Sequence, residues 1–270
     1  VAAAPRGVHA TEAPAPSEVA AQQHADLVER PQHEVEDGSL YQGQWLGNTR
    51  HGRGILRKKD GQVYEGEFAN GMPQGRGTFQ ASNGNSYDGQ WYKDRAHGRG
   101  KFCHVDGSSY EGEWAEDEKS GAGVEMWADG ARYEGQFMQG GKHGDGCYES
   151  GTGIKYTGHF KHDRMEGEGT YLFVDGRIYN GQWKSGHMDG KGRMTWRSGS
   201  VYEGAYQKDV KSGEGMYTWP NGQVYRGQWR NGKQDGTGEF VDSSGIKTVG
   251  EWRNGEPLTS AGPSPSHVAP

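Results

Sequence analysis

The period of the chain constrains its fold more than any other feature. A tyrosine returns every 23 residues, nine times and without insertion. The nine positions are Tyr41, Tyr64, Tyr87, Tyr110, Tyr133, Tyr156, Tyr179, Tyr202 and Tyr225. A glycine follows each tyrosine after two residues and an aromatic ring after four, as in Gly112 and Trp114, and a tenth, partial repeat begins at Thr248. A strict period of this length predicts an array of similar supersecondary units rather than one globular core.

Residue parity within each repeat predicts a β-hairpin. Alternate residues of a strand share a face, so the tyrosine, the glycine and the following ring point the same way, and the rings can fold over the bare glycine. A Gly-x-Gly pair in the second half of each repeat, such as Gly98 and Gly100, shares its parity with a further apolar residue, here Phe102. Turn pairs such as Asp106-Gly107 precede the next tyrosine, and we expect them to supply the positive-φ residues of a tight turn.

Stacking is needed to stabilise such hairpins, because a single one is marginal in water. The sequence therefore predicts an all-β, elongated, single-layer antiparallel meander, a solenoid-like ribbon of 23-residue β-hairpin repeats. With about 4.8 Å between strands, nine repeats would extend roughly 90 Å. Its two edge strands, at Tyr41 and near Trp252, would invite homodimerisation through the terminal repeats unless the flanking segments cover them.

Composition places the array between two tails. The chain has 48 glycines and 31% hydrophobic residues, too few for one large core, although its 11% aromatic content supports an ordered structure built on rings. Residues 1–37 are rich in Ala, Pro and Glu and lack apolar periodicity, so a disordered tail is predicted there. The array is expected at residues 38–255, and the Pro/Ser-rich residues 256–270 are predicted to be disordered.

The repeated pattern resembles the MORN (membrane occupation and recognition nexus) repeat from Tyr41 to about Gly255. Its signature is visible in Tyr110-Glu111-Gly112-Glu113-Trp114. The resemblance implies a docking platform or self-associating rod, as in radial-spoke head components, parasite cytoskeletal scaffolds, junctophilins and the regulatory segments of plant phosphatidylinositol phosphate kinases. Departures from the pattern are Glu125 in place of an aromatic, Tyr206 in place of Trp, and the turns Thr152-Gly153 and Ser198-Gly199.

The function expected on this basis is that of a non-catalytic scaffold, cytoskeletal or ciliary in the manner of a radial-spoke head. Partner helices or peptides would lie on a groove of aromatic rings near the middle of the array. The rings expected to line this groove are Trp91, Trp114, Phe137, Phe160 and Trp183. The alternative is a membrane- or phosphoinositide-associated regulatory segment of a larger enzyme, such as a phosphatidylinositol phosphate kinase.

Charge favours protein partners over lipid or nucleic acid. Beyond Leu40 the chain has 28 basic and 29 acidic residues, a net charge of 28 − 29 = −1. Recognition of anionic lipids usually shows as clusters of basic residues, so weak lipid contact at most is expected. Nucleic-acid binding is not expected, because no basic footprint covers the chain.

The sequence contains no recognisable catalytic or metal site. No serine lies in a nucleophile elbow, and no helix follows the Gly-x-Gly pairs, as phosphate binding would require. His51, His97 and His143 occupy equivalent positions two repeats apart, roughly 19 Å, whereas zinc ligands lie about 2.3 Å or less from the metal. Cys103 and Cys147 are predicted to stay unpaired. Without a signal peptide or an apolar span, a cytoplasmic location with cytoskeletal or ciliary association is expected.

Overall fold

The computed structural model describes residues 27–35 and 37–258. Over these residues the chain forms 21 strands and no helix, which confirms the all-β class. The strands are β1 (Leu27–Glu34), β2 (Leu40–Leu46), β3 (Thr49–Arg57), β4 (Val63–Ala69), β5 (Met72–Gln80), β6 (Ser86–Tyr92), β7 (Arg95–Cys103), β8 (Ser109–Ala115), β9 (Glu118–Met126), β10 (Arg132–Met138), β11 (Gly141–Glu149), β12 (Lys155–Lys161), β13 (Arg164–Leu172), β14 (Ile178–Lys184), β15 (His187–Thr195), β16 (Val201–Gln207), β17 (Val210–Thr218), β18 (Val224–Arg230), β19 (Lys233–Val241), β20 (Lys247–Arg253) and β21 (Glu256–Pro257).

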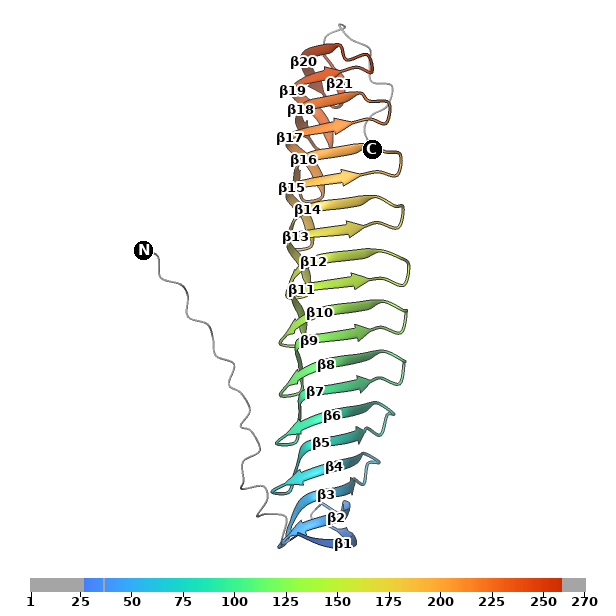
Figure 1. The fold of residues 1–270 in the computed structure, drawn as a ribbon, viewed down its shortest axis with the longest axis vertical. Helices are drawn as coiled ribbons and strands as arrows, with labels where there is room; N and C mark the ends of the chain where they lie inside the picture. Colours follow the sequence, from blue (N-terminus) through green and yellow to red (C-terminus); the bar gives the residue numbers. More distant parts are fainter. Residues whose placement is uncertain (1–26, 36, 259–270) are drawn as a thin grey trace, which may run out of the picture. The chain divides into compact units, whose positions relative to one another are not determined.

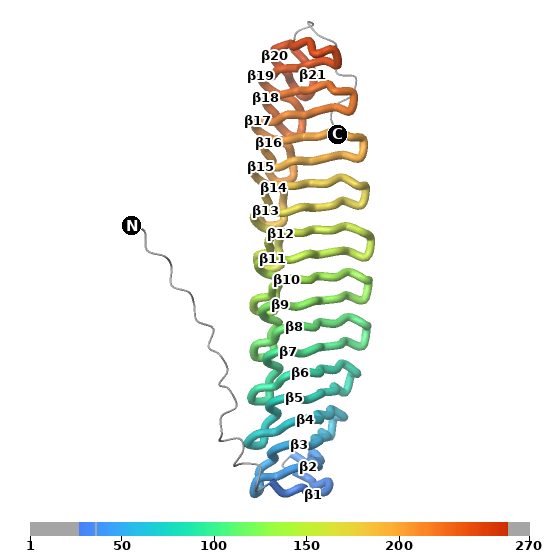
Figure 2. The backbone as a smooth tube through the Cα atoms, viewed as in Figure 1, coloured from blue at the N-terminus to red at the C-terminus, as the bar shows by residue number. Residues whose placement is uncertain are grey.

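Contacts divide the chain into two compact units. Unit 1 holds residues 1–82 and 91–95, and within it β1 to β5 pair antiparallel in chain order. Unit 2 holds residues 83–90 and 96–270. There the strands from β7 onward also pair antiparallel in chain order, and Figures 1 and 2 show successive hairpins of this unit following one another. The predicted antiparallel meander is thus confirmed within each unit, and the 90 Å extension stays a prediction.

Each repeat consists of a seven-residue strand that carries the tyrosine and a nine-residue strand that carries Gly-x-Gly, as in β8 and β9. The first glycine of that pair lies at a bulge, where the register between the two strands shifts. Gly98 has a φ of +64°, and the side chain of Gln90 closes the bulge by accepting a hydrogen bond from the Arg99 N–H at 2.8 Å. A glycine is therefore required at this position by the backbone conformation.

The Asp-Gly pairs lie in turns between antiparallel strands, as predicted, with positive φ at the glycine, as at Gly107 (91°). These turns form five-residue loops between repeats, where the Gly107 N–H donates to the His104 carbonyl at 3.1 Å. In that loop Asp106 Oδ1 accepts the Ser108 N–H at 2.8 Å, so the aspartate closes the loop through its side chain.

A second set of turns was not predicted: from the second repeat onward, two-residue turns with positive φ at both residues join the two strands inside a repeat, for example Glu116 (51°) and Asp117 (71°). Where the second turn residue is an aspartate, it also binds its hairpin to the preceding one. Asp117 donates its N–H to the Ala96 carbonyl at 3.0 Å, and its Oδ1 accepts the Ala96 N–H at 2.7 Å. Asp209 makes the same pair of bonds to Met188. The side-chain bonds offset part of the strain of a non-glycine residue in the left-handed region.

The predicted disordered tails contain structure. Residues 27–34, inside the tail predicted at 1–37, form β1 and pair with β2 from Leu27↔Leu46 to Glu34↔Leu40, so β2 is not an open edge. At the other end β21 pairs with β20 through Trp252↔Pro257. Apolar periodicity missed β1 because backbone hydrogen bonds, rather than a buried face, hold this strand. The remaining parts of both tails, 1–26 and 259–270, lie outside the described residues.

Candidate binding surface

The repeat tyrosines cover the glycines. The Tyr110 ring lies over Gly112 and Gly123, and a Cβ added to either glycine would be 2.5 Å from Tyr110 Oη. That hydroxyl donates to the Glu113 carbonyl at 2.9 Å. The same arrangement recurs at the other repeat tyrosines, for example Tyr133 and Tyr225. The prediction that rings fold over bare glycines is confirmed, and close approach of ring to backbone explains why the motif needs Gly.

Within each unit, the tyrosines and the rings four residues later form a continuous aromatic column. Each ring meets its neighbours edge-on, as Tyr110 does with Trp114 at 5.0 Å and with Phe137 of the next repeat at 4.9 Å. In unit 2 the column runs from Tyr87 to Trp252 with centroid separations of 4.9 to 5.5 Å. This column, rather than a central core, stabilises the fold.

Of the five rings predicted to line a groove, Trp91 belongs to the column of unit 1 and the other four belong to the column of unit 2. Trp114, Phe137, Phe160 and Trp183 are 9% exposed or less, and Trp91 is half-buried with its Nε1 donating to the Gly77 carbonyl at 2.9 Å. The expectation that these rings stand open to a partner is therefore wrong for the four buried ones, because neighbouring repeats cover them. Residue parity identified the aromatic face but could not show which of its rings are covered.

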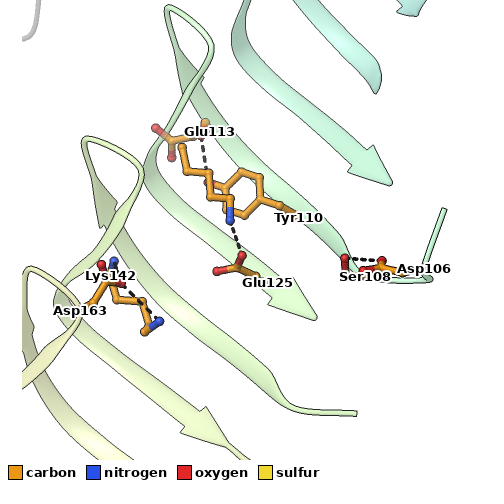
Figure 3. A network of polar contacts seen from close by, with 8 residues as sticks. Asp106, Ser108, Tyr110, Glu113, Glu125, Lys142 and Asp163 are labelled. Carbon is orange, nitrogen blue, oxygen red and sulfur yellow. Dashed lines mark hydrogen bonds and ion pairs between the residues drawn. The ribbon is translucent and has the colours of Figure 1, made fainter. Parts of the chain in front are cut away.

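Long cationic side chains lie over parts of the column. Lys119 lies 5.2 Å above the Tyr110 ring and forms an ion pair with Glu125. Figure 3 shows and labels Tyr110 and Glu125. Glu125, which departs from the usual aromatic, is thus compensated by a cation from the same strand. Lys142 lies 5.7 Å above the Tyr133 ring and pairs with Asp163 at 3.3 Å. These side chains cover ring faces with their aliphatic stems and place charge on the π surface.

Lys211 is the most enclosed of these cations. Its Nζ lies 5.1 to 5.6 Å from the centres of four rings, and the residue is 7% exposed. The rings are Trp196, Tyr202, Tyr217 and Trp229. Burial lowers the pKa of Lys211 from its ordinary 10.5 to about 8, since the charged form is poorly solvated there.

Lys211 is expected to make stability rise with pH. Below about pH 8 the folded and unfolded chains both carry the charge, so the burial cost is present in full; above the unfolded pKa of 10.5 both are neutral and the cost vanishes. The free energy of unfolding of the parent, relative to that of Lys211→Met, should rise by about 2 kcal/mol between pH 7.5 and 10. Chemical denaturation of both chains measures this, and tyrosine ionisation cancels in the comparison. If the free energies of unfolding of the two chains changed in parallel with pH, the predicted effect of burying Lys211 would be contradicted.

A second set of aromatic rings, the loop aromatic row, stays half-buried in unit 2. Its members open the five-residue loops at the same position of four repeats and are Trp127, Phe173, Trp196 and Trp219. Each contacts a ring of a neighbouring long strand: Trp127 meets Tyr148 at 6.0 Å, and Trp219 meets Tyr217 at 4.6 Å. Sequence reasoning missed this row, although the 23-residue spacing of Phe173, Trp196 and Trp219 was the available signal.

Cations accompany the loop aromatic row. Lys142 lies 5.2 Å from the Trp127 ring, Arg177 lies 4.5 Å from Phe173, and Lys211 lies 5.1 Å from Trp196. The exposed side chain of Val174, 71% accessible, follows Phe173 in the same loop. Rings that are packed on one side and accessible on the other, next to cations, are typical of protein contact surfaces.

In unit 2, the face of the sheet opposite the aromatic column carries a shallow groove of about 840 Å³. Glycines form its floor, including Gly181 and Gly192, and charged residues form its sides. Arg193 and Glu203 of this groove lie directly opposite each other on β15 and β16. Since such opposite charges are neighbours across strands, the groove resembles an ordinary solvated face and indicates no ligand.

Residues 27–35 and 37–258 contain no group of three or more His, Cys, Asp or Glu side chains placed to hold a metal ion. None of His51, His97 and His143 belongs to such a group in the described residues. The His143 ring centroid lies 6.4 Å from that of His159 and 5.5 Å from that of His162. Cys103 and Cys147 are free. In the same described part of the chain no helix is long and apolar enough to span a bilayer.

Comparison with known proteins identifies the repeat. The family model of the MORN repeat matches nine consecutive segments: residues 41–63, 64–86, 87–109, 110–132, 133–155, 156–176, 179–201, 202–224 and 225–247. No curated protein matches the chain.

Among solved structures, the SAS-4 TCP domain of Drosophila melanogaster, in complex with a proline-rich motif of Ana2, is similar over 82% of this chain and 96% of its own, at 12% identity and a TM-score of 0.32. The TCP10 domain of Danio rerio CPAP covers 82% and 93%, at 10% identity and a TM-score of 0.27. A catalytically inactive virginiamycin B lyase from Staphylococcus aureus covers 86% and 87%, at 11% and 0.16. With TM-scores this low, these likenesses carry no argument about function.

Proposed function

The chain belongs to the MORN repeat family, and from this premise we propose that it is a non-catalytic scaffold that binds protein partners through the loop aromatic row. The observation that carries the proposal is that Phe173, Trp196 and Trp219 remain half-buried in consecutive repeats while the column rings are covered. Accessible rings on a rigid support are the side chains most often found at the centre of protein interfaces.

The spacing of the row fits an amphipathic helix. Consecutive repeats advance by two strands, so neighbouring rings of the row are about 10 Å apart. A helix rises about 10.5 Å over seven residues, so apolar side chains seven apart would meet successive rings. Three consecutive rings, Phe173, Trp196 and Trp219, therefore match a helix of about 14 residues lying across the strands.

The test is a pull-down from an extract of ciliated cells, with the full chain as bait beside the double variant Trp196→Ala and Trp219→Ala. The control carries Val105→Ala and Val249→Ala, which are 74% and 77% exposed and lie outside the row. Each captured partner is then purified and its affinity measured. We expect the double variant to lose at least about tenfold in affinity and the control to match the parent.

Equal affinity of the parent and the double variant for the same partners, with both correctly folded by circular dichroism, would contradict binding through the row. Cosedimentation with phosphoinositide vesicles, in the absence of any protein partner, would instead favour a membrane-associated regulatory segment. We expect the scaffold to act in the cytoplasm, at the cytoskeleton or cilium. The captured partners should therefore be cytoskeletal or axonemal proteins.

A further inference from the structure

Strand β1 pairs with the first strand of the first repeat, β2, but it lacks the Gly-x-Gly sequence of the long repeat strands. Where β3 precedes β4, Gly54 lies opposite the central glycine of β4, Gly66. Where β1 precedes β2, Arg30 lies opposite the equivalent Gly43. The first repeat is thus covered by a strand that lacks the Gly-x-Gly sequence with which long repeat strands pair.

The indole N–H of Trp45, in β2, finds no hydrogen-bond acceptor in β1. The Trp45 ring is 5% exposed, and its Nε1 is buried with no hydrogen-bond partner among the described residues. In later repeats the equivalent Nε1 donates to the second glycine of the preceding Gly-x-Gly strand, as Trp114 does to the Gly100 carbonyl at 3.0 Å. A buried N–H without a partner is costly, so this end of unit 1 favours any strand that brings a carbonyl to the same place.

Arg30 occupies the place of a missing tyrosine. The ring of Phe68 lies between Tyr41 at 5.1 Å and Tyr64 at 5.0 Å. Trp45 has Tyr41 at 5.1 Å on one side, but its other neighbour is the Arg30 guanidinium at 4.9 Å. The Arg30 side chain therefore takes the place of the tyrosine ring that a preceding repeat would supply.

Few side-chain contacts hold β1 in place. Six of its eight residues are exposed, including Val28 at 56%. Besides the contact with Trp45, Arg30 donates to the Gly47 carbonyl at 2.7 Å, and the His33 ring lies 6.3 Å from Trp45. A strand that buries so little apolar surface belongs to the least stable part of a structure and opens first.

We propose that β1 is a displaceable strand, and that the edge of β2 with Trp45 beneath it binds an extended Gly-x-Gly strand presented by another repeat protein. The incoming strand places a glycine opposite Gly43 and a carbonyl within reach of Trp45 Nε1, and β1 provides neither. Strand addition to a sheet edge supplies backbone hydrogen bonds for affinity and side-chain fit for selectivity. The site lies in unit 1 and is independent of the loop aromatic row.

The probe is a fluorescent peptide with the sequence of β17, Val210–Thr218, because its Gly215 carbonyl accepts the Trp229 Nε1–H at 3.1 Å in the intact chain. Its anisotropy is followed as the full-length parent or the full-length Arg30→Ala variant is added. We expect Arg30→Ala to bind at least about tenfold more tightly, since a weakened β1 competes less. Trp45→Phe in the Arg30→Ala background should reduce affinity about fivefold, because it keeps a ring and removes the donor.

A peptide of the same composition in scrambled order, with no Gly-x-Gly pair, is the matched control and should bind at least about tenfold more weakly, because it cannot place a glycine opposite Gly43 and keep the next carbonyl in register. Equal binding of both peptides would overturn the proposal. So would the absence of binding to Arg30→Ala and to His33→Ala, which weakens β1 through its second contact, when circular dichroism matches the parent. If the Arg30→Ala variant formed a dimer in solution and bound no peptide, the edge of β2 would bind a second copy of the chain, and this result would also overturn the proposal.

Discussion

Replacing Gly227 with alanine should lower the free energy of unfolding by about 3 kcal/mol. A Cβ at this position would be 2.5 Å from Gly238 Cα, 2.6 Å from the Thr237 carbonyl oxygen and 2.8 Å from Tyr225 Oη. Two of these atoms belong to the backbone of the neighbouring strand and cannot rotate away, so β18 and β19 must separate. Chemical denaturation followed by tryptophan fluorescence gives the change in stability, and hydrogen exchange of the two strands locates it.

The chain supplies a matched control for this effect. Gly250 occupies the same position in the partial repeat, but Thr248 stands there in place of the tyrosine. A Cβ on Gly250 would meet only the Trp252 ring, at 3.5 Å, which is an ordinary contact. Gly250→Ala should therefore change stability by less than about 0.5 kcal/mol. A similar loss for both variants would show that backbone flexibility, rather than the covering ring and the adjacent strand, explains the repeated glycine.

Tyr133→Ala should cost about 4 kcal/mol, the largest single effect expected in the array. The residue is fully buried, and its ring contacts Phe137 and Phe160 at 5.1 Å each, so truncation interrupts the aromatic column between two repeats. Because each repeat contacts only its neighbours, the loss should also divide the unfolding of unit 2 into two steps. Denaturation monitored by tryptophan fluorescence and by far-ultraviolet circular dichroism would then give curves that no longer coincide.

Tyr133→Phe separates the ring from its hydroxyl. The hydroxyl donates to the Gln136 carbonyl at 3.0 Å, and its loss alone should cost about 1 kcal/mol. The ratio of the two effects measures how much of the column is ring packing. If Tyr133→Phe were as destabilising as Tyr133→Ala, the hydrogen bond rather than the edge-on contacts would stabilise the repeat.

Features inside a single repeat could be predicted from the sequence, because they follow from local geometry. Period-two parity placed Tyr110, Gly112 and Trp114 on one face, and the structure folds the tyrosine ring over the glycine as expected. The Asp-Gly pairs located the turns between repeats, but no sequence pattern located the turns inside the repeats. Positive φ at Glu116 and Asp117 has no local signature as strong as Asp-Gly, and hydrogen bonds to Ala96 of the preceding repeat stabilise it.

Features that depend on other parts of the chain appeared only in the tertiary structure. Strand β1 has no periodic face of its own, and its pairing with β2 requires a partner strand whose edge is otherwise open. Trp183 and Trp196 are equally aromatic in the sequence, yet one is 5% exposed in the column and the other is half-buried in a loop. Period and parity determined the hairpin, the aromatic face and the family. Burial of each ring is set by atoms from neighbouring repeats, so only the folded array decided which rings stabilise it and which remain accessible to a partner.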